Sequence, residues 1–109
     1  MNKIVGIDLG TTNSLVAVVE DGRPRVLERD GQRLIPSVVG RADSGEIIVG
    51  QEALNQYVLA PERTVRSIKR RMGTTEQIKL GDTTYSPEEI SAFILRHLKQ
   101  MAEDILGEG

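Results

Sequence analysis

Two strand-like segments joined by a short polar turn constrain the fold of this chain more than any other feature. The first is the apolar run Lys3–Asp8 and the second is Ser14–Glu20, and both are rich in the β-branched residues that favour strands. Between them lies Leu9-Gly-Thr-Thr-Asn13, in which Gly10 provides the backbone freedom that a tight connection needs. The sequence therefore predicts a β-hairpin.

The predicted turn gathers polar groups at one exposed end of this hairpin. Backbone N–H groups of such a turn can point at one position, and the hydroxyls of Thr11 and Thr12 add uncharged donors beside Asn13. This arrangement suits the β- and γ-phosphates of a nucleotide, and Asp8 could hold a Mg²⁺ ion through its water shell. An ordinary hairpin with polar residues in its loop is the alternative, because short polar turns are common.

Composition narrows the function classes. The 109 residues form one domain or a piece of one, and with two Tyr, one Phe and no Trp the core must be aliphatic. Fourteen basic and sixteen acidic residues give a net charge of −2, and the basic run Lys69-Arg70-Arg71 is too short to indicate a nucleic-acid surface. Absence of cysteine excludes disulfides and thiolate chemistry and is typical of intracellular proteins. No signal peptide or membrane span is predicted.

The middle of the chain alternates short strands with helical segments. Pro36 cannot donate to a strand ladder, so its segment belongs at a sheet edge or a crossing. Helical spacing of Val65, Ile68 and Met72 predicts a short helix or helical turn over Thr64–Met72. The other predicted elements are strands at Arg25–Glu28, Leu34–Val39 and Glu46–Val49, a helix at Gln51–Val58, and a hairpin of Ile78–Leu80 with Thr83–Tyr85.

The final predicted element is a long helix with clear signals at both ends. Ser86 as N-cap, Pro87 at the first helical position and Glu89 three residues after the cap form a capping box, and Gly107 ends the helix. One face is apolar from Ile90 to Leu106, so the helix needs a sheet to cover. Strands followed by a capped helix usually lead to another strand of the same sheet, and we therefore expect a truncated unit.

Other catalytic signatures are weak or absent. The sequence contains neither G-x-x-x-x-G-K-[ST] nor G-x-G-x-x-G, which argues against Walker-type and dinucleotide sites. The single histidine, His97, is expected at the boundary of the apolar helix face rather than in a catalytic triad. The acid pairs Glu88-Glu89 and Glu103-Asp104 suit a helix N-terminus and a solvated face better than a glycosidase site.

Five segments spread over nearly all of the chain form a recognisable series. They are Ile7–Ser14, Ile35–Val38, Val49–Gln51, Thr64–Gly73 and Tyr85–Ser91. In type and order these segments resemble the N-terminal part of the Hsp70 chaperone family, of the bacterial DnaK type. The connection from Gly73 to Tyr85 is short, as in compact bacterial members.

The resemblance implies an α/β fold of the actin-like, ribonuclease-H-like ATPase type, with two lobes and ATP in the cleft between them. Residues 1–109 would be part of the first lobe, with a mixed sheet, a hairpin phosphate loop and a covering C-terminal helix. Residues 1–38 and 86–109 would form the core sheet and helix, and residues 39–85 a peripheral subdomain.

The resemblance also implies a site and its cofactors, ATP or ADP with Mg²⁺. Gly10, Thr11, Thr12 and Asn13 would line the β- and γ-phosphates, and Asp8 would hold Mg²⁺ through water. Lys69 would be the catalytic lysine, reaching the γ-phosphate and the attacking water, where a fixed positive charge stabilises the transition state.

The complete protein would be a cytoplasmic, ATP-hydrolysing stress-response chaperone that binds and releases unfolded polypeptide. Its partners would be a J-domain protein and a nucleotide exchange factor, with no nucleic acid and no membrane. This chain alone is expected to bind Mg-nucleotide weakly at best and to be inactive as an ATPase. The alternatives are another actin-like ATPase, either a sugar kinase or a filament protein, and a non-enzymatic interaction module.

Overall fold

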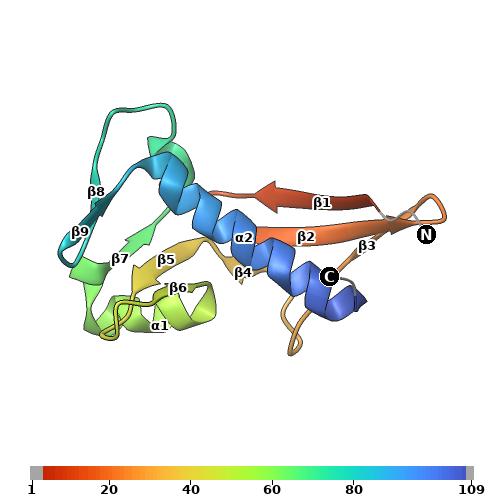
Figure 1. Ribbon diagram of the computed structural model, residues 1–109. Coiled ribbons are helices and arrows are strands. Elements are labelled where there is room, and N and C mark those ends of the chain that lie inside the picture. The colour runs from red at the N-terminus through yellow and green to blue at the C-terminus, as the bar shows by residue number, and fades with distance from the viewer. Residues whose placement is uncertain (1–3, 108–109) are drawn as a thin grey trace.

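The structure, a computed structural model, describes residues 4–107 as a mixed α/β arrangement of three small sheets and two α-helices (Figure 1). The described part of the chain is elongated, with principal extents of 46 × 29 × 23 Å. Neither α-helix in this part combines the length and apolarity needed to cross a lipid bilayer.

The first sheet contains the predicted hairpin. Strand β1 (Ile4–Leu9) runs antiparallel to β2 (Asn13–Glu20), with Leu9 opposite Ser14, which confirms the hairpin; Lys3 lies outside the described residues. Strand β3 (Arg23–Val26) begins two residues before the predicted Arg25–Glu28 segment. The reason is the Asp21-Gly22 turn, whose two positive φ angles suit a two-residue hairpin and bring Glu20 opposite Arg23.

The predicted strand Leu34–Val39 is divided between two sheets. Strand β4 (Ile35–Pro36) pairs with the start of β2, whereas β5 (Val38–Arg41) is the central strand of a second sheet with β6 (Ile47–Val49) and β7 (Thr64–Arg66). Pro36 therefore lies at a crossing, as the sequence predicted, and Ser37 is the residue at which the chain leaves one sheet for the other.

The prediction of a helix over Thr64–Met72 was wrong in its first half. Helix α1 (Gln51–Leu59) forms as predicted and is followed by the 3₁₀-helix η1 (Pro61–Arg63), but the chain then enters strand β7. Thr64 and Val65 are β-branched and pair with β5, which outweighs their helical spacing. Ser67, in the left-handed region at φ 54°, separates β7 from the 3₁₀-helix η2 (Ile68–Arg71).

The last third of the described chain agrees with the sequence pattern. Strands β8 (Ile78–Leu80) and β9 (Thr83–Tyr85) form the predicted hairpin. Helix α2 (Pro87–Leu106) begins with the complete capping box of Ser86 and Glu89 and ends at Gly107, which has a positive φ.

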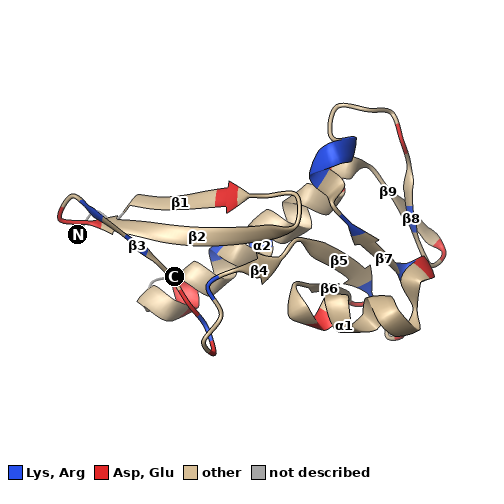
Figure 2. Cartoon of the chain, turned by 180° about the vertical axis from the view of Figure 1, so that it is seen from behind, with Lys and Arg blue, Asp and Glu red and all other residues tan. Residues whose placement is uncertain are grey.

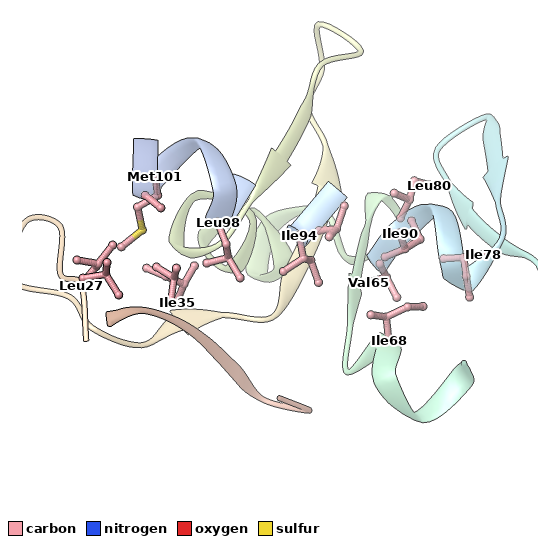
Figure 3. Close-up of a cluster of buried hydrophobic side chains, with 14 residues drawn as sticks. Leu27, Ile35, Val65, Ile68, Ile78, Leu80, Ile90, Ile94, Leu98 and Met101 are labelled. Carbon is pink, nitrogen blue, oxygen red and sulfur yellow. The ribbon is translucent and has the colours of Figure 1, made fainter. Parts of the chain in front are cut away.

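Helix α2 lies across the first and second sheets and supplies one side of a continuous core (Figure 3). Towards its C-terminus, Leu98 and Met101 lie near Ile35 and Leu27, on the first sheet and the chain just after it. Towards its N-terminus, Ile90 lies near the apolar side chains of the second and third sheets and of η2, namely Val65, Ile68, Ile78 and Leu80. The helix therefore joins elements that do not otherwise share one sheet.

Strand β1 forms an open edge of the first sheet. Within residues 4–107 it pairs only with β2, and Ile4 and Val5 are 68% and 42% exposed. A hollow of about 650 Å³ runs between β1 and α2, lined mainly by apolar side chains that include Val5, Ile7 and Leu95. The hollow lies on the core face of the sheet, because Val5 and Ile7 are paired with the buried Val18 and Val16 of β2, and α2 covers this face less completely at the β1 edge than over β2.

Candidate functional site

The turn that joins β1 to β2 is held by a neighbouring serine. The Ser37 hydroxyl donates to the Gly10 carbonyl oxygen over 2.9 Å, and the Ser37 backbone N–H donates to the Thr12 carbonyl oxygen over 2.9 Å. A Cβ atom at position 10 would overlap the carbonyl oxygen of Asn13, so the turn closes only around glycine. Two hydrogen bonds from Ser37 therefore hold the backbone carbonyl groups of Gly10 and Thr12 in place.

A second serine completes this support. Ser14 and Ser37 are 1% and 2% exposed, and their hydroxyl oxygens lie 2.8 Å apart. Because the Ser37 hydroxyl donates to Gly10, Ser14 donates to Ser37, and both buried hydroxyls have a partner. The sequence analysis gave Ser37 no role; its one local signal was its place after Pro36, where the chain changes direction.

Thr11, Thr12 and Asn13 line a small crevice at this turn. Its other polar walls come from Ser37 and from Arg66 and Ser67 at the end of β7, and its volume is about 60 Å³. That is roughly twice the volume of a water molecule in the liquid, so the crevice can admit one tetrahedral anion rather than a whole nucleotide.

The groups in the crevice are suited to an anion. No carboxylate is among the residues that line it, and within the described chain the side chains of Thr11, Thr12 and Asn13 form no hydrogen bonds. Their donors are therefore available, and an arginine adds positive charge. This donor set fits a phosphate group.

Lys69 is close in sequence to residues that line the crevice, but Lys69 itself does not line it. Lys69 is exposed on η2, two residues after Ser67, and neither Lys69 nor Asp8 is among the described residues that line the crevice. Figure 2 shows η2, which carries Lys69, Arg70 and Arg71, as a blue segment of the ribbon.

Asp8 stands alone as a possible metal-binding group. It lies exposed on β1 opposite Leu15, two residues before Gly10, and no cluster of three His, Asp or Glu side chains capable of holding a metal occurs within residues 4–107. A single exposed carboxylate suits a Mg²⁺ ion that keeps most of its waters, and does not suit a metal enclosed by protein ligands.

His97 lies away from the crevice, as expected for a boundary residue. It is partly buried on α2 against the Gly50 turn that precedes α1. Burial is the main cause that lowers the pKa of His97, and the charge of Arg29 lowers this pKa further, whereas Glu52 raises it. The neutral imidazole is therefore favoured, and its role is in packing.

Comparison with known proteins gives one consistent result. The profile of the family described as "Hsp70 protein" matches residues 4–80. Chaperone protein DnaK from Thermotoga neapolitana is 53% identical over 106 residues, which cover 95% of this chain and 18% of the relative. The DnaK proteins of Thermotoga petrophila and Thermotoga maritima show the same identity and coverage. The chain therefore spans about a fifth of the length of the curated relatives that it matches.

Proposed function

Because this chain belongs to the Hsp70 family, we propose that it is part of the first lobe of an actin-like ATPase domain. The domain would serve an ATP-dependent chaperone of the DnaK type. In this assignment residues 1–38 and 86–109 form the core sheet and helix, and residues 39–85 form a peripheral subdomain. The chain passes from the first sheet to the second at Ser37, and this supports a boundary near residue 38.

The observation that carries the proposal is the fixed turn at Gly10–Asn13. Its backbone is held by Ser37, its side-chain donors are free, and its crevice has the size of one phosphate group. A turn that is rigid before the ligand arrives loses less conformational entropy on binding. An ordinary polar hairpin has no need of two buried serines behind its loop.

We assign the side chains as follows. Thr11, Thr12 and Asn13 bind the β- and γ-phosphates, and Asp8 accepts hydrogen bonds from the waters of Mg²⁺. Lys69 extends from η2 to the γ-phosphate and orients the attacking water. When bound, ATP with its Mg²⁺ supplies the phosphoryl group whose transfer to water drives the chaperone cycle.

In the complete protein, ATP binding and hydrolysis would switch a separate domain between loose and tight binding of unfolded polypeptide. A J-domain protein and a nucleotide exchange factor would act on this cycle in the cytoplasm. The 109 residues correspond to about a fifth of the DnaK relatives, so we expect this chain alone to bind nucleotide weakly and not to turn it over.

An NMR titration with Mg-ADP tests the proposed site. Amide signals of Gly10–Asn13 should shift progressively as Mg-ADP is raised to millimolar concentration, because the turn is already formed. Thr12→Val should weaken these shifts by removing one donor, whereas Thr84→Val, on an exposed strand residue outside the crevice, serves as the matched control.

One outcome would contradict the proposed site, and another would contradict the expected inactivity of this chain. A folded spectrum in which the turn amides do not move would show that these residues form no phosphate site in this chain. Steady phosphate release from ATP above that of a Lys69→Ala variant would contradict the expectation that the chain alone does not hydrolyse ATP.

A further inference from the structure

Arg66 occupies a position between the phosphate turn and helix α1. It is the last residue of β7 and lies opposite Val38 of β5, so the two side chains are on the same face of the second sheet. Val38 packs with Ala53 and Leu54 of α1, which identifies this as the α1 face. Arg66 is exposed and lines the same crevice as Thr11 and Thr12.

Tyr57 of α1 restrains the Arg66 side chain. The guanidinium carbon of Arg66 lies 5.1 Å from the centre of the Tyr57 ring. In a cation–π contact the aromatic ring occupies one face of the guanidinium plane, and the N–H groups around its edge remain available as donors. Tyr57 therefore orients Arg66 without satisfying its hydrogen bonds.

The positive charge of Arg66 is not neutralised by a carboxylate in the described chain. Arg63 pairs with Asp43, and Arg71 pairs with Glu76 over 3.1 Å, but Arg66 has no ion pair within residues 4–107. Arg66 also lines a neighbouring cavity of about 310 Å³ that contains Arg71 and Lys79. Arg71 is already paired with Glu76, so the charges that favour an anion here are those of Arg66 and Lys79, and no carboxylate of the described chain lines either the crevice or this cavity.

We propose that Arg66, oriented by Tyr57, is a phosphate-binding residue of the Gly10–Asn13 site. Its N–H groups donate to oxygens of the anion that occupies the crevice beside Thr11 and Thr12. Arginine keeps its charge at all physiological pH values and can make two parallel hydrogen bonds to a phosphate. This inference rests on the proposed function and adds an arginine that lines the crevice, which Lys69 does not.

Titration of the ¹⁵N-labelled chain with inorganic pyrophosphate tests this proposal, with amide signals of Gly10–Asn13 and the Nε–H signal of Arg66 as readouts. Arg66→Ala should raise the dissociation constant at least about tenfold, since hydrogen bonds to charged groups are stronger than those between neutral groups. The dissociation constant of Arg66→Lys should lie between those of the wild type and Arg66→Ala, because lysine keeps the positive charge but lacks the planar set of donors. Raising the salt concentration should weaken binding by the wild type more than by Arg66→Ala.

Arg96→Ala is the matched control. Arg96 is also exposed and lies over an aromatic ring, with its guanidinium carbon 5.7 Å from the centre of Phe93, but it is on α2 and does not line the crevice. The dissociation constant of the Arg96→Ala variant for pyrophosphate should equal that of the wild type.

The possible results separate this inference from the proposed function. Turn amides that shift equally in the wild type and in Arg66→Ala would overturn the role of Arg66 and leave the phosphate turn intact. Turn amides that never shift in the wild type would overturn both. If Arg66→Ala does not fold, the wild-type Nε–H signal decides, and an unchanged signal during saturation of the turn overturns the role of Arg66.

Discussion

Gly10 lies where the β1–β2 turn has no space for a side chain. A Cβ atom at this position would overlap the Asn13 carbonyl oxygen, which is backbone and cannot rotate away. The close approach is the reason that the turn can present Thr11, Thr12 and Asn13 to one crevice. The tight turn therefore both requires glycine at position 10 and brings the three polar residues to one crevice.

Gly10→Ala should destabilise the chain and disrupt the turn. The backbone must open to admit the methyl group, at a cost of about 1–3 kcal/mol in the free energy of unfolding. Urea denaturation measures the loss, with Gly6→Ala as the matched control, because a Cβ at Gly6 on β1 meets nothing within 4 Å. Equal stability of the two variants would show that the turn is more adaptable than its geometry indicates.

His97 should make stability depend on pH in a defined window. Its pKa is lowered in the folded chain, first by burial and then by Arg29, from an unfolded value of 6.5. The unfolded chain therefore binds the proton more tightly, so stability is complete above about pH 6.5 and is lost as the pH falls below that value towards the folded pKa.

Urea denaturation at pH 7.5 and pH 5.5 measures this effect while most carboxylates stay ionised. His97→Gln should reduce the difference in the free energy of unfolding between the two pH values. The charge of Glu52 raises the pKa of His97, so Glu52→Gln should increase the difference in the free energy of unfolding between pH 7.5 and pH 5.5. A pH dependence that survives unchanged in His97→Gln would assign it to other groups.

At the level of elements, α2 begins at a well-defined residue. The Ser86 hydroxyl accepts from the Glu89 N–H over 3.1 Å, and the Glu89 carboxylate accepts from the Ser86 N–H over 2.9 Å. Both contacts lie within four residues of sequence, so the residues that make them can be recognised without knowledge of the long-range pairing. The start of α2 is accordingly the feature that local sequence predicts best.

Ser86→Ala should lower stability by about 1 kcal/mol through loss of this N-cap. Thermal denaturation followed by circular dichroism measures the change. Glu88→Ala is the control, because Glu88 is an exposed acid in the same first turn and takes no part in the capping box. A loss in Glu88→Ala as large as that in Ser86→Ala would assign the effect to first-turn charge instead of capping.

At the scale of the whole molecule, the sequence predicts the elements that local residue patterns determine. It does not predict elements that depend on pairing with a distant strand. The β1–β2 hairpin, α1, the β8–β9 hairpin and α2 were predicted and are present. Strand β7 was missed because Val65 has both helical spacing and a β-branched side chain, and its pairing with Val39, 26 residues earlier in the chain, decides between them.

The same limit applies to the candidate site. Gly10 and Thr11–Asn13 are contiguous, so a pattern could indicate them, and the structure places the last three in one crevice. Ser37 lies between β4 and β5 and Arg66 ends β7, so both reach the crevice from distant parts of the chain, and no local pattern assigned either of them to the site. The roles of Asp8 and Lys69 remain predictions, because neither lines the crevice within the described chain.

Helix α2 has a consequence for synthesis of the chain on the ribosome. It covers the core from Leu27 to Leu80, yet it is the last helix along the described chain. A nascent chain that has emerged only as far as β9 holds the apolar side chains of its sheets without their cover. Such exposed surfaces favour association with other chains. We therefore expect the described part of the chain to complete its core only after α2 leaves the exit tunnel, and to expose these apolar surfaces until then.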